Sequence, residues 1–224
     1  MNYISRGDNF WASVYGWMAA ALTVTAVTAW YIAMTPRFWA FFSENPMLLF
    51  VMMIVQLAMV FIFTAVLGRL HVGWAALTFF LYAFTLGVTL SVIFKVYAVS
   101  SIYVTFFVSA GMFACMALYG FFTRTDLSKV GSLMIMVLFG LILSLFINLF
   151  VQSSAFDTFL SFIGVIVFAL LTAYDMQKLR YIQHAVAGSG MSSVEALRGA
   201  FTLYLDFINL FLMLLRFTGK RNNE

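Results

Sequence analysis

Charged residues are scarce in this chain. Only 9% of its 224 residues are Asp, Glu, Lys or Arg, whereas 64% are apolar and the mean hydropathy is +1.03. Soluble domains carry roughly 25% charged residues, so there is too little charge here to cover a water-facing surface. The scarcity excludes a soluble enzyme and predicts that a bilayer surrounds most of the molecule. The basic residues lie mostly between apolar runs, which is typical of membrane anchoring rather than nucleic-acid binding.

Cysteine and several catalytic motifs are also missing. Cys115 is the only cysteine and lies inside an apolar run, so no internal disulfide can form. The polar start and the long apolar run after it do not match a cleavable signal peptide. The sequence has no phosphate-binding glycine loop, no HExxH pair, no intramembrane histidine base and no lysine in the last apolar run. We therefore expect no enzyme and no bound cofactor.

Seven apolar runs are long enough to cross a bilayer. A hydrocarbon core about 30 Å thick needs roughly 20 helical residues, and lipid leaves backbone polar groups no partners outside the helix. We expect spans at about residues 12–34, 47–67, 73–94, 98–121, 131–151, 159–176 and 199–217. The sequence predicts an all-α membrane protein, a single polytopic membrane domain over residues 1–224.

The connections between the spans are expected to be short loops, except the sixth. Pro36 and Pro46 bracket the first loop. The sixth is expected to run over about residues 178–198, where Ser192 and Glu195 have the spacing of a capping box that would start the last helix.

Basic residues favour a cytoplasmic N-terminus. Seven Lys or Arg residues fall in the loops on the N-terminal side, against five on the other side. The loop with Lys178, Arg180 and His184 is then cytoplasmic. Seven spans would place the C-terminus outside, unless the last segment is re-entrant.

Two carboxylates lie within or at the edge of the apolar runs. Asp175 ends the sixth run and Asp206 lies early in the seventh, so both fall near the same membrane face. Two neighbouring carboxylates cannot both ionise cheaply, and they titrate as a pair with shared apparent pKa values. This arrangement is typical of a pH sensor or proton-linked gate, although two unrelated, locally bonded acids would give the same pattern. Calcium binding by the pair is a further candidate, because calcium prefers carboxylate oxygens.

Polar stripes along several spans have two interpretations, a hydrated pathway or close helix packing. Thr202, Asp206 and Asn209 share one face of the last span, and Thr172 and Asn148 lie on similar stripes of the sixth and fifth. These residues are candidates to line a hydrated pathway. Small and hydroxyl residues also let membrane helices pack closely, and close packing is the favoured reading for the third and fifth spans.

Two strings near the C-terminus resemble a known family. TAYDMQKLR followed by ALRGAFTLYLDFINLFLMLLRFTG resembles the C-terminal signature of the Bax inhibitor-1 family, the transmembrane Bax inhibitor motif proteins. FFVSAGMFACMALYGFFTRTDLSKVGSLMIMVLFGLI is similar to its fourth and fifth spans, and TLGVTLSVIF to its third. The resemblance covers residues 11–219, and the short N-terminus looks like the bacterial branch.

The resemblance implies a seven-helix bundle with the last helix central, in a bacterial inner membrane. Bacterial members are described as pH-sensitive calcium leak channels. The family's paired aspartates match Asp175 and Asp206, and Arg69 best matches an arginine that can pair with the first of them. Some bacterial members instead bind a membrane-anchored AAA protease, and eukaryotic members suppress cell death. The ending GKRNNE lacks the lysine-rich tail of animal members, so the cell-death role does not carry over directly.

Three functions stay open at this point. The first is a calcium-permeable leak pathway gated by protonation of Asp175 and Asp206. The second is a membrane interaction protein that modulates a protease or another partner through its N-terminal segment. A proton-coupled transporter is the third, and the lack of a visible inverted repeat disfavours it. The sequence leaves undetermined the transported ion, the sign of the pH response, the partner and the oligomeric state.

Overall fold

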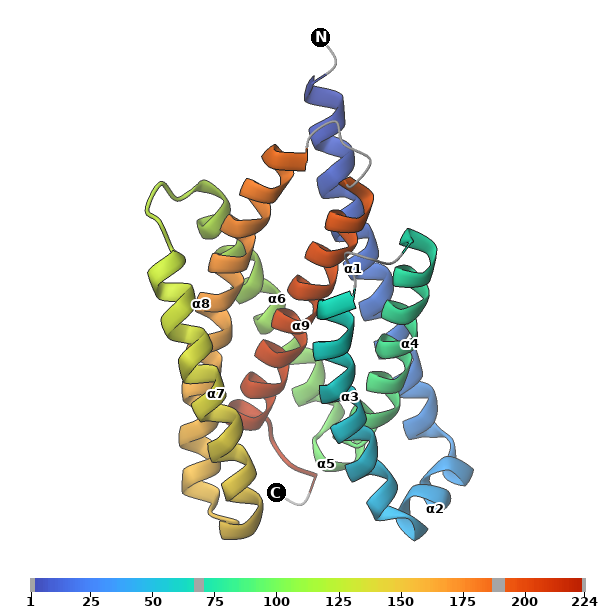
Figure 1. The fold of residues 1–224 in the computed structure, drawn as a ribbon. Coiled ribbons are helices and arrows are strands. Elements are labelled where there is room, and N and C mark those ends of the chain that lie inside the picture. The colour runs from blue at the N-terminus through green and yellow to red at the C-terminus, as the bar shows by residue number, and fades with distance from the viewer. Residues whose placement is uncertain (1–2, 67–70, 187–191, 223–224) are drawn as a thin grey trace. The chain divides into compact units, whose positions relative to one another are not determined.

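The computed structural model describes residues 3–66, 71–186 and 192–222 (Figure 1). Within these ranges the chain is helical, and its only β-pairing is an isolated bridge between Tyr97 and Arg221. The helices are α1 (Tyr3–Met34), α2 (Pro36–Glu44), α3 (Pro46–Val66), α4 (Val72–Leu90), α5 (Ile93–Val96), α6 (Val99–Phe122), α7 (Ser128–Val151), α8 (Ser154–Val186) and α9 (Ser192–Thr218).

Seven of these helices are long and apolar enough to cross a membrane, which confirms the predicted all-α fold with seven spans. Their burial differs widely. In α3 and α7, only 11% of the most apolar 18-residue stretch is buried inside the protein. In α9, 67% of the corresponding stretch is buried, the highest share of the seven. The high burial of α9 agrees with the expectation that the last helix is enclosed by protein. It also explains how a span can carry Asp206 without facing lipid.

Two expected loops are helical in the structure. The segment between Pro36 and Pro46 forms α2, which Pro36 can start because the first helical position needs no backbone N–H donor. The predicted loop over residues 178–198 is mostly helix, since α8 continues to Val186 and α9 already begins at Ser192. Hydropathy marks where a helix leaves the hydrocarbon, and these helices extend past that point.

The chain divides into two compact units. The first, here the N-terminal unit, comprises Met1–Val96 and Ala185–Phe201, and the second, the C-terminal unit, comprises Tyr97–His184 and Thr202–Glu224. α9 therefore contributes its first turns to one unit and Thr202–Thr218 to the other. The units are described separately below.

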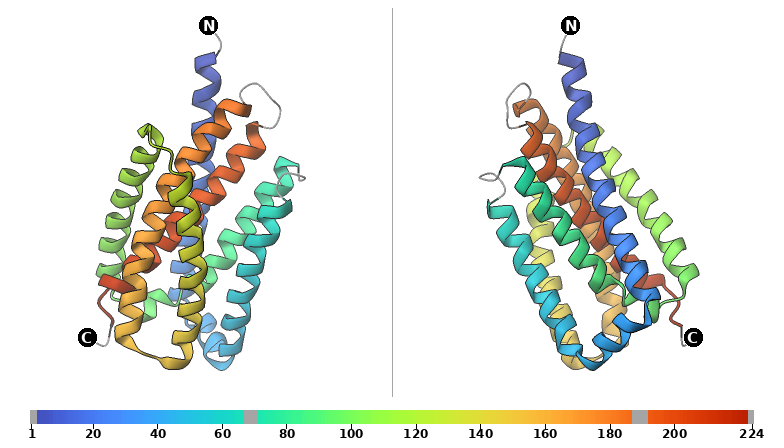
Figure 2. Two further views of the ribbon diagram at one scale, coloured as in Figure 1. Left: turned by 60° about the vertical axis from the view of Figure 1, so that its left-hand side comes forward. Right: turned by 90° about the vertical axis from the view of Figure 1, so that its right-hand side faces the viewer.

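In the N-terminal unit, α1 and α4 lie side by side (Figures 1 and 2). Gly87 permits this close approach, because a Cβ there would lie 2.7 Å from the Thr25 carbonyl oxygen. The Thr25 hydroxyl donates to the Ala83 carbonyl at 3.0 Å. On α3, the buried Gln56 amide donates to the Thr85 carbonyl oxygen at 2.8 Å. Polar groups thus tie these helices together where lipid would offer them no partner.

In the C-terminal unit, glycines let α8 meet its neighbours at three points. A Cβ on Gly120 of α6 would overlap the backbone of Ala173, and one on Gly131 of α7 would overlap the Tyr174 ring. On α8 itself, a Cβ on Gly164 would lie 2.6 Å from the Met213 sulfur of α9. Glycines therefore allow close helix packing at these three contacts.

The C-terminal segment after α9 lies against the start of α6. The Ala98 amide donates to the Lys220 carbonyl at 3.0 Å, and the Lys220 amide donates to the Ser101 hydroxyl at 3.1 Å. Gly219 makes the turn possible, because a Cβ there would lie 2.8 Å from the Tyr97 ring. These bonds satisfy backbone groups at the end of α9.

Candidate functional site

The site lies within the C-terminal unit, where α8 and α9 bring Asp175 and Asp206 together. Asp175 follows Phe168 and Thr172 along the buried stripe of α8, at the spacing of four and three residues that defines one helix face. Asp206 lies roughly four turns after Ser192, with Leu203 and Leu210 on the same buried face of α9. Asp206 lies deeper along α9 than along its apolar run, because α9 begins at Ser192, where the capping-box spacing predicted its start.

The two carboxyl groups face each other closely enough for a hydrogen bond between them. Asp206 is only 6% exposed, whereas Asp175 is partly exposed. A hydrogen bond between two carboxyl groups requires a proton on one of them, since ionised carboxylates only accept. A pair bonded in this way would hold one proton and carry at most one negative charge.

Two further features define the surroundings of the pair. Oδ2 of Asp206 is buried, and the described residues provide it with no hydrogen-bond partner. Lys178, one turn further along α8, is a positive charge that acts on Asp175. The Lys178 ammonium lies 6.0 Å from the centre of the Tyr174 ring. The pair is thus asymmetric, with Asp175 nearer to a cation and to water and Asp206 enclosed.

Other candidate residues are mostly bonded within their own helices. The Thr172 hydroxyl is fully buried and donates to the Phe168 carbonyl at 2.7 Å. The Asn209 amide donates to the Leu205 carbonyl at 2.9 Å. Asn148 lies near the other end of the unit, where its amide oxygen accepts from the Ser153 amide at 3.2 Å. Thr202 is half-buried. A pathway-lining role for these four residues stays a prediction.

Arg69 lies outside the described residues, so its pairing with Asp175 also stays a prediction. His71 is exposed and begins α4, where its Nδ1 accepts from the Gly73 amide at 3.3 Å. Among the described residues, no three His, Cys, Asp or Glu side chains gather as a metal site. The Asp175 and Asp206 carboxylates are the acidic oxygens that the site would offer to a cation.

Sequence reasoning missed two residues close to the site, Gln177 and Arg180. The buried Gln177 side chain accepts from the Leu127 amide at 2.9 Å and donates to the Thr125 carbonyl at 2.8 Å. The Arg180 guanidinium donates to the Phe121 carbonyl and, at 3.5 Å, to the Thr123 carbonyl. Together they fasten the α6–α7 connection to the turns of α8 that follow Asp175.

An ion pair joins α8 and α9 near their other ends. The Arg216 guanidinium lies 3.6 Å from the Asp157 carboxylate, and both side chains are partly exposed. Asp157 is in the first turns of α8 and Arg216 in the last turn of α9. An ion pair therefore joins the two helices near one end, and Asp175 and Asp206 face each other further along them.

Comparison with known proteins gives matches along nearly the whole chain. The profile of the family described as "Inhibitor of apoptosis-promoting Bax1" matches residues 7–223. Inner membrane protein YbhL of Escherichia coli (strain K12) is 44% identical over 216 residues, which cover 96% of this chain and 92% of that protein. An uncharacterised protein of Deinococcus radiodurans is 40% identical, with 95% and 91% covered. One from Borreliella burgdorferi is 38% identical, with 97% and 94% covered.

Proposed function

Because the chain belongs to the Bax inhibitor-1 family of membrane proteins, we propose that it forms a pH-sensitive, calcium-permeable leak pathway gated by Asp175 and Asp206. The observation that carries the proposal is the close approach of these two carboxyl groups, from α8 and α9. The similarity to an inner membrane protein supports placing the pathway in a bacterial inner membrane.

The gate would work through the shared proton. While the proton is present, the hydrogen bond links α8 to α9. Once it leaves, two negative charges face each other in a site that excludes most water, and they repel strongly. The repulsion is relieved if the helices separate or if a cation approaches. Proton occupancy is thereby coupled to the distance between the two helices.

Calcium enters this proposal as the transported ion, not as a resident cofactor. It binds six to eight oxygen ligands when held in a protein site, and two carboxylates with one unpaired oxygen supply only part of such a shell. A partial shell suits an ion that passes and leaves, because conduction needs binding weak enough for release. Arg69 is proposed as the group that stabilises the ionised pair in the other gating state.

Calcium release from proteoliposomes tests this function. Purified protein should release entrapped calcium faster than empty vesicles do, with a rate that depends on pH. The double change Asp175→Asn and Asp206→Asn should abolish that dependence. Glu44→Gln is the matched control, because it alters an exposed carboxylate at the end of α2, outside the pair and outside the α8–α9 contact. Release no faster than from empty vesicles would contradict the leak.

The alternative is a membrane interaction protein that modulates a membrane-anchored AAA protease. It predicts that the doubly substituted protein still binds such a protease and that calcium release is absent in the unmodified protein. Measuring both properties on the same preparations separates the two functions.

A further inference from the structure

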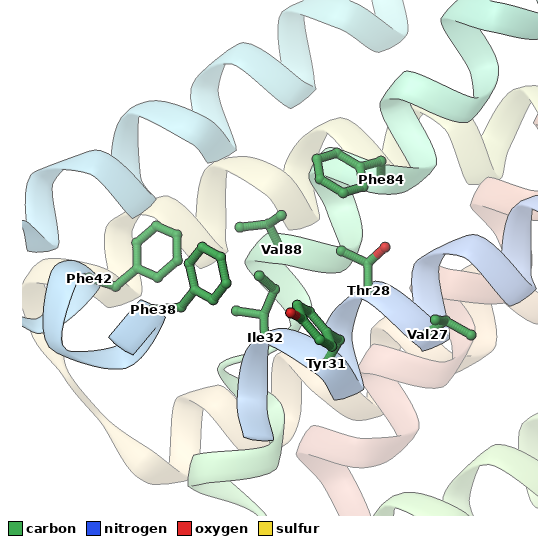
Figure 3. A pocket seen from close by; sticks show the side chains of 8 residues that line it. All are labelled: Val27, Thr28, Tyr31, Ile32, Phe38, Phe42, Phe84 and Val88. Atoms are coloured by element: carbon green, nitrogen blue, oxygen red, sulfur yellow. The ribbon is translucent and has the colours of Figure 1, made fainter. Parts of the chain in front are cut away.

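An apolar groove opens on the surface of the N-terminal unit, between α1, α2 and α4 (Figure 3). Its volume is about 310 Å³. The floor is made by Ile32, Phe42 and Val88, which are buried against one another. The walls include Val27 and Phe84, whose side chains are 59% and 49% exposed. The groove is therefore open to the surroundings of the helices and has a tightly packed base.

Helical periodicity builds each wall of the groove. Tyr31 follows Val27 by one turn on α1, and Phe42 follows Phe38 by one turn on α2. The Tyr31 and Phe38 rings meet edge to face at the corner between the helices, with centroids 6.4 Å apart. The corner is fixed in part by Thr35, whose hydroxyl donates to the Tyr31 carbonyl at 2.8 Å. The groove is thus a defined feature of the fold.

The position of the groove along the helices indicates what fills it. Tyr31 and Ile32 lie in the last turn of α1, which ends at Met34, and Val88 lies in the last turn of α4. Both helices are candidate membrane spans. The groove is therefore expected to open to lipid, near the point where α1 leaves the hydrocarbon core. The surroundings at that depth are acyl chains, and water does not compete for an apolar site there.

Cationic and donor groups lie on α2 and α5, next to this boundary. Arg37 is exposed and directly precedes the groove residue Phe38. The Lys95 ammonium lies 5.4 Å from the centre of the Trp39 ring. Nε1 of Trp39 is a buried donor for which the described residues supply no acceptor. Interfacial tryptophan N–H groups and basic side chains are the usual partners of lipid phosphates.

We propose that the α1–α2–α4 groove binds one acyl chain of an anionic phospholipid, whose phosphate lies against the exposed cations Arg37 and Lys95. The apolar walls accept the chain, and the positive charges complement the headgroup. The occupant is a lipid of the surrounding bilayer, and its binding is independent of the Asp175–Asp206 gate.

Photo-crosslinking in vesicles tests the proposal. The protein is reconstituted in phosphatidylcholine containing a small fraction of phosphatidylglycerol with a diazirine on one acyl chain. Crosslinks from this probe should concentrate on the peptides that contain Val27, Tyr31, Phe38 and Phe84. A phosphatidylcholine probe with the same diazirine should label these peptides less. Labelling spread over all exposed helix faces, equally for both probes, would overturn the proposal.

Two substitutions sharpen the test. Val27→Trp fills the groove and should remove the concentrated labelling, whereas Val104→Trp, at a 64% exposed valine of α6, should leave it unchanged. Arg37→Ala should reduce labelling by the phosphatidylglycerol probe about fivefold, the factor expected for one cation near an anionic lipid surface. Unaltered labelling in Val27→Trp would exclude the groove, and unaltered labelling in Arg37→Ala would exclude the charge contact. If Val27→Trp fails to fold, the positions of the crosslinked peptides in the unmodified protein decide whether the groove binds lipid.

Discussion

At the scale of single residues, polar side chains in this protein are costly unless something pairs with them. Gln56 and Gln177 each bridge to backbone groups of another segment, and Asp206 faces a second acid. A membrane interior provides no water to replace such partners. Within the described part of the chain, Oδ2 of Asp206 is among the buried side-chain atoms that lack such a partner, and Asp206 is one of the two residues of the proposed gate.

Asp126 gives a residue-scale prediction outside the membrane. Its carboxylate accepts a hydrogen bond from the Ser128 amide at 2.9 Å, and hydrogen bonding by Ser128 lowers its pKa below the ordinary value of 3.8. A carboxyl whose pKa is lowered on folding stabilises the fold at pH above 3.8, and this contribution is lost as pH falls through the lower, folded value.

The start of α7 should accordingly loosen only at acidic pH. Amide hydrogen exchange around Ser128, corrected for intrinsic rates, should accelerate as the pH drops below 3.8. Asp126→Asn should remove most of that pH dependence, because the substituted side chain does not titrate. Equal pH dependence in both proteins would show that the Asp126 bond does not stabilise the helix start.

At the scale of elements, the sequence revealed where helices cross the membrane but not where they end. The apolar run over residues 159–176 predicts a span, yet α8 continues through Lys178 and Arg180 to Val186. Polar residues beyond the hydrocarbon look the same in the sequence whether they form a loop or a helix. The role of Gln177 could not be predicted from the sequence either, because its hydrogen-bond partners lie on a connection distant in sequence.

Removing the Gln177 side chain should free the α6–α7 connection. Gln177→Ala leaves the buried Leu127 amide and the Thr125 carbonyl without their partner, at a cost of about 1–3 kcal/mol. Hydrogen exchange at Leu127 should rise, and thermal stability should fall. Gln177→Glu retains an acceptor for the Leu127 amide and should recover part of the loss. An unchanged exchange rate in Gln177→Ala would mean that the connection is held by other contacts.

Two glycines of α6 should respond in opposite ways to alanine. Gly120→Ala introduces a Cβ into the backbone of Ala173, and overpacking of this kind costs about 1–3 kcal/mol. Gly111 has no atom within 4 Å of its Cβ position, so Gly111→Ala should gain about 0.5–1 kcal/mol of helix stability. Thermal unfolding in detergent compares the two variants with the parent. Equal effects would contradict the close α6–α8 contact.

At the scale of the whole molecule, the lengths of the apolar runs were enough to predict the all-α fold with seven spans, and the family resemblance implied the enclosed last helix. The pairing of Asp175 with Asp206 was inferable, because two isolated acids in apolar runs near one membrane face have few other partners. The groove between α1, α2 and α4 could not be inferred. It depends on the corner at Thr35 and on the helix that Pro36 starts, and the sequence alone suggested a loop there.

Orientation in the membrane is a further whole-molecule prediction. The connection between α8 and α9 should be cytoplasmic, because Lys178, Arg180 and Arg198 lie on its side. A reporter enzyme fused near Gly188 that works only in the cytoplasm should be active, and one that works only outside should be inactive. The reverse result would invert the topology and place the N-terminus outside.

The pH profile of calcium release tests the central claim most directly. The rate from proteoliposomes containing the unmodified protein should change between about pH 5 and 8, the range accessible to a strongly coupled acid pair. Asp175→Asn and Asp206→Asn should each flatten this profile. The double substitution should do little more than either alone, because both residues act on one shared proton. A profile of unmodified shape in either single variant would contradict the aspartate-pair gate.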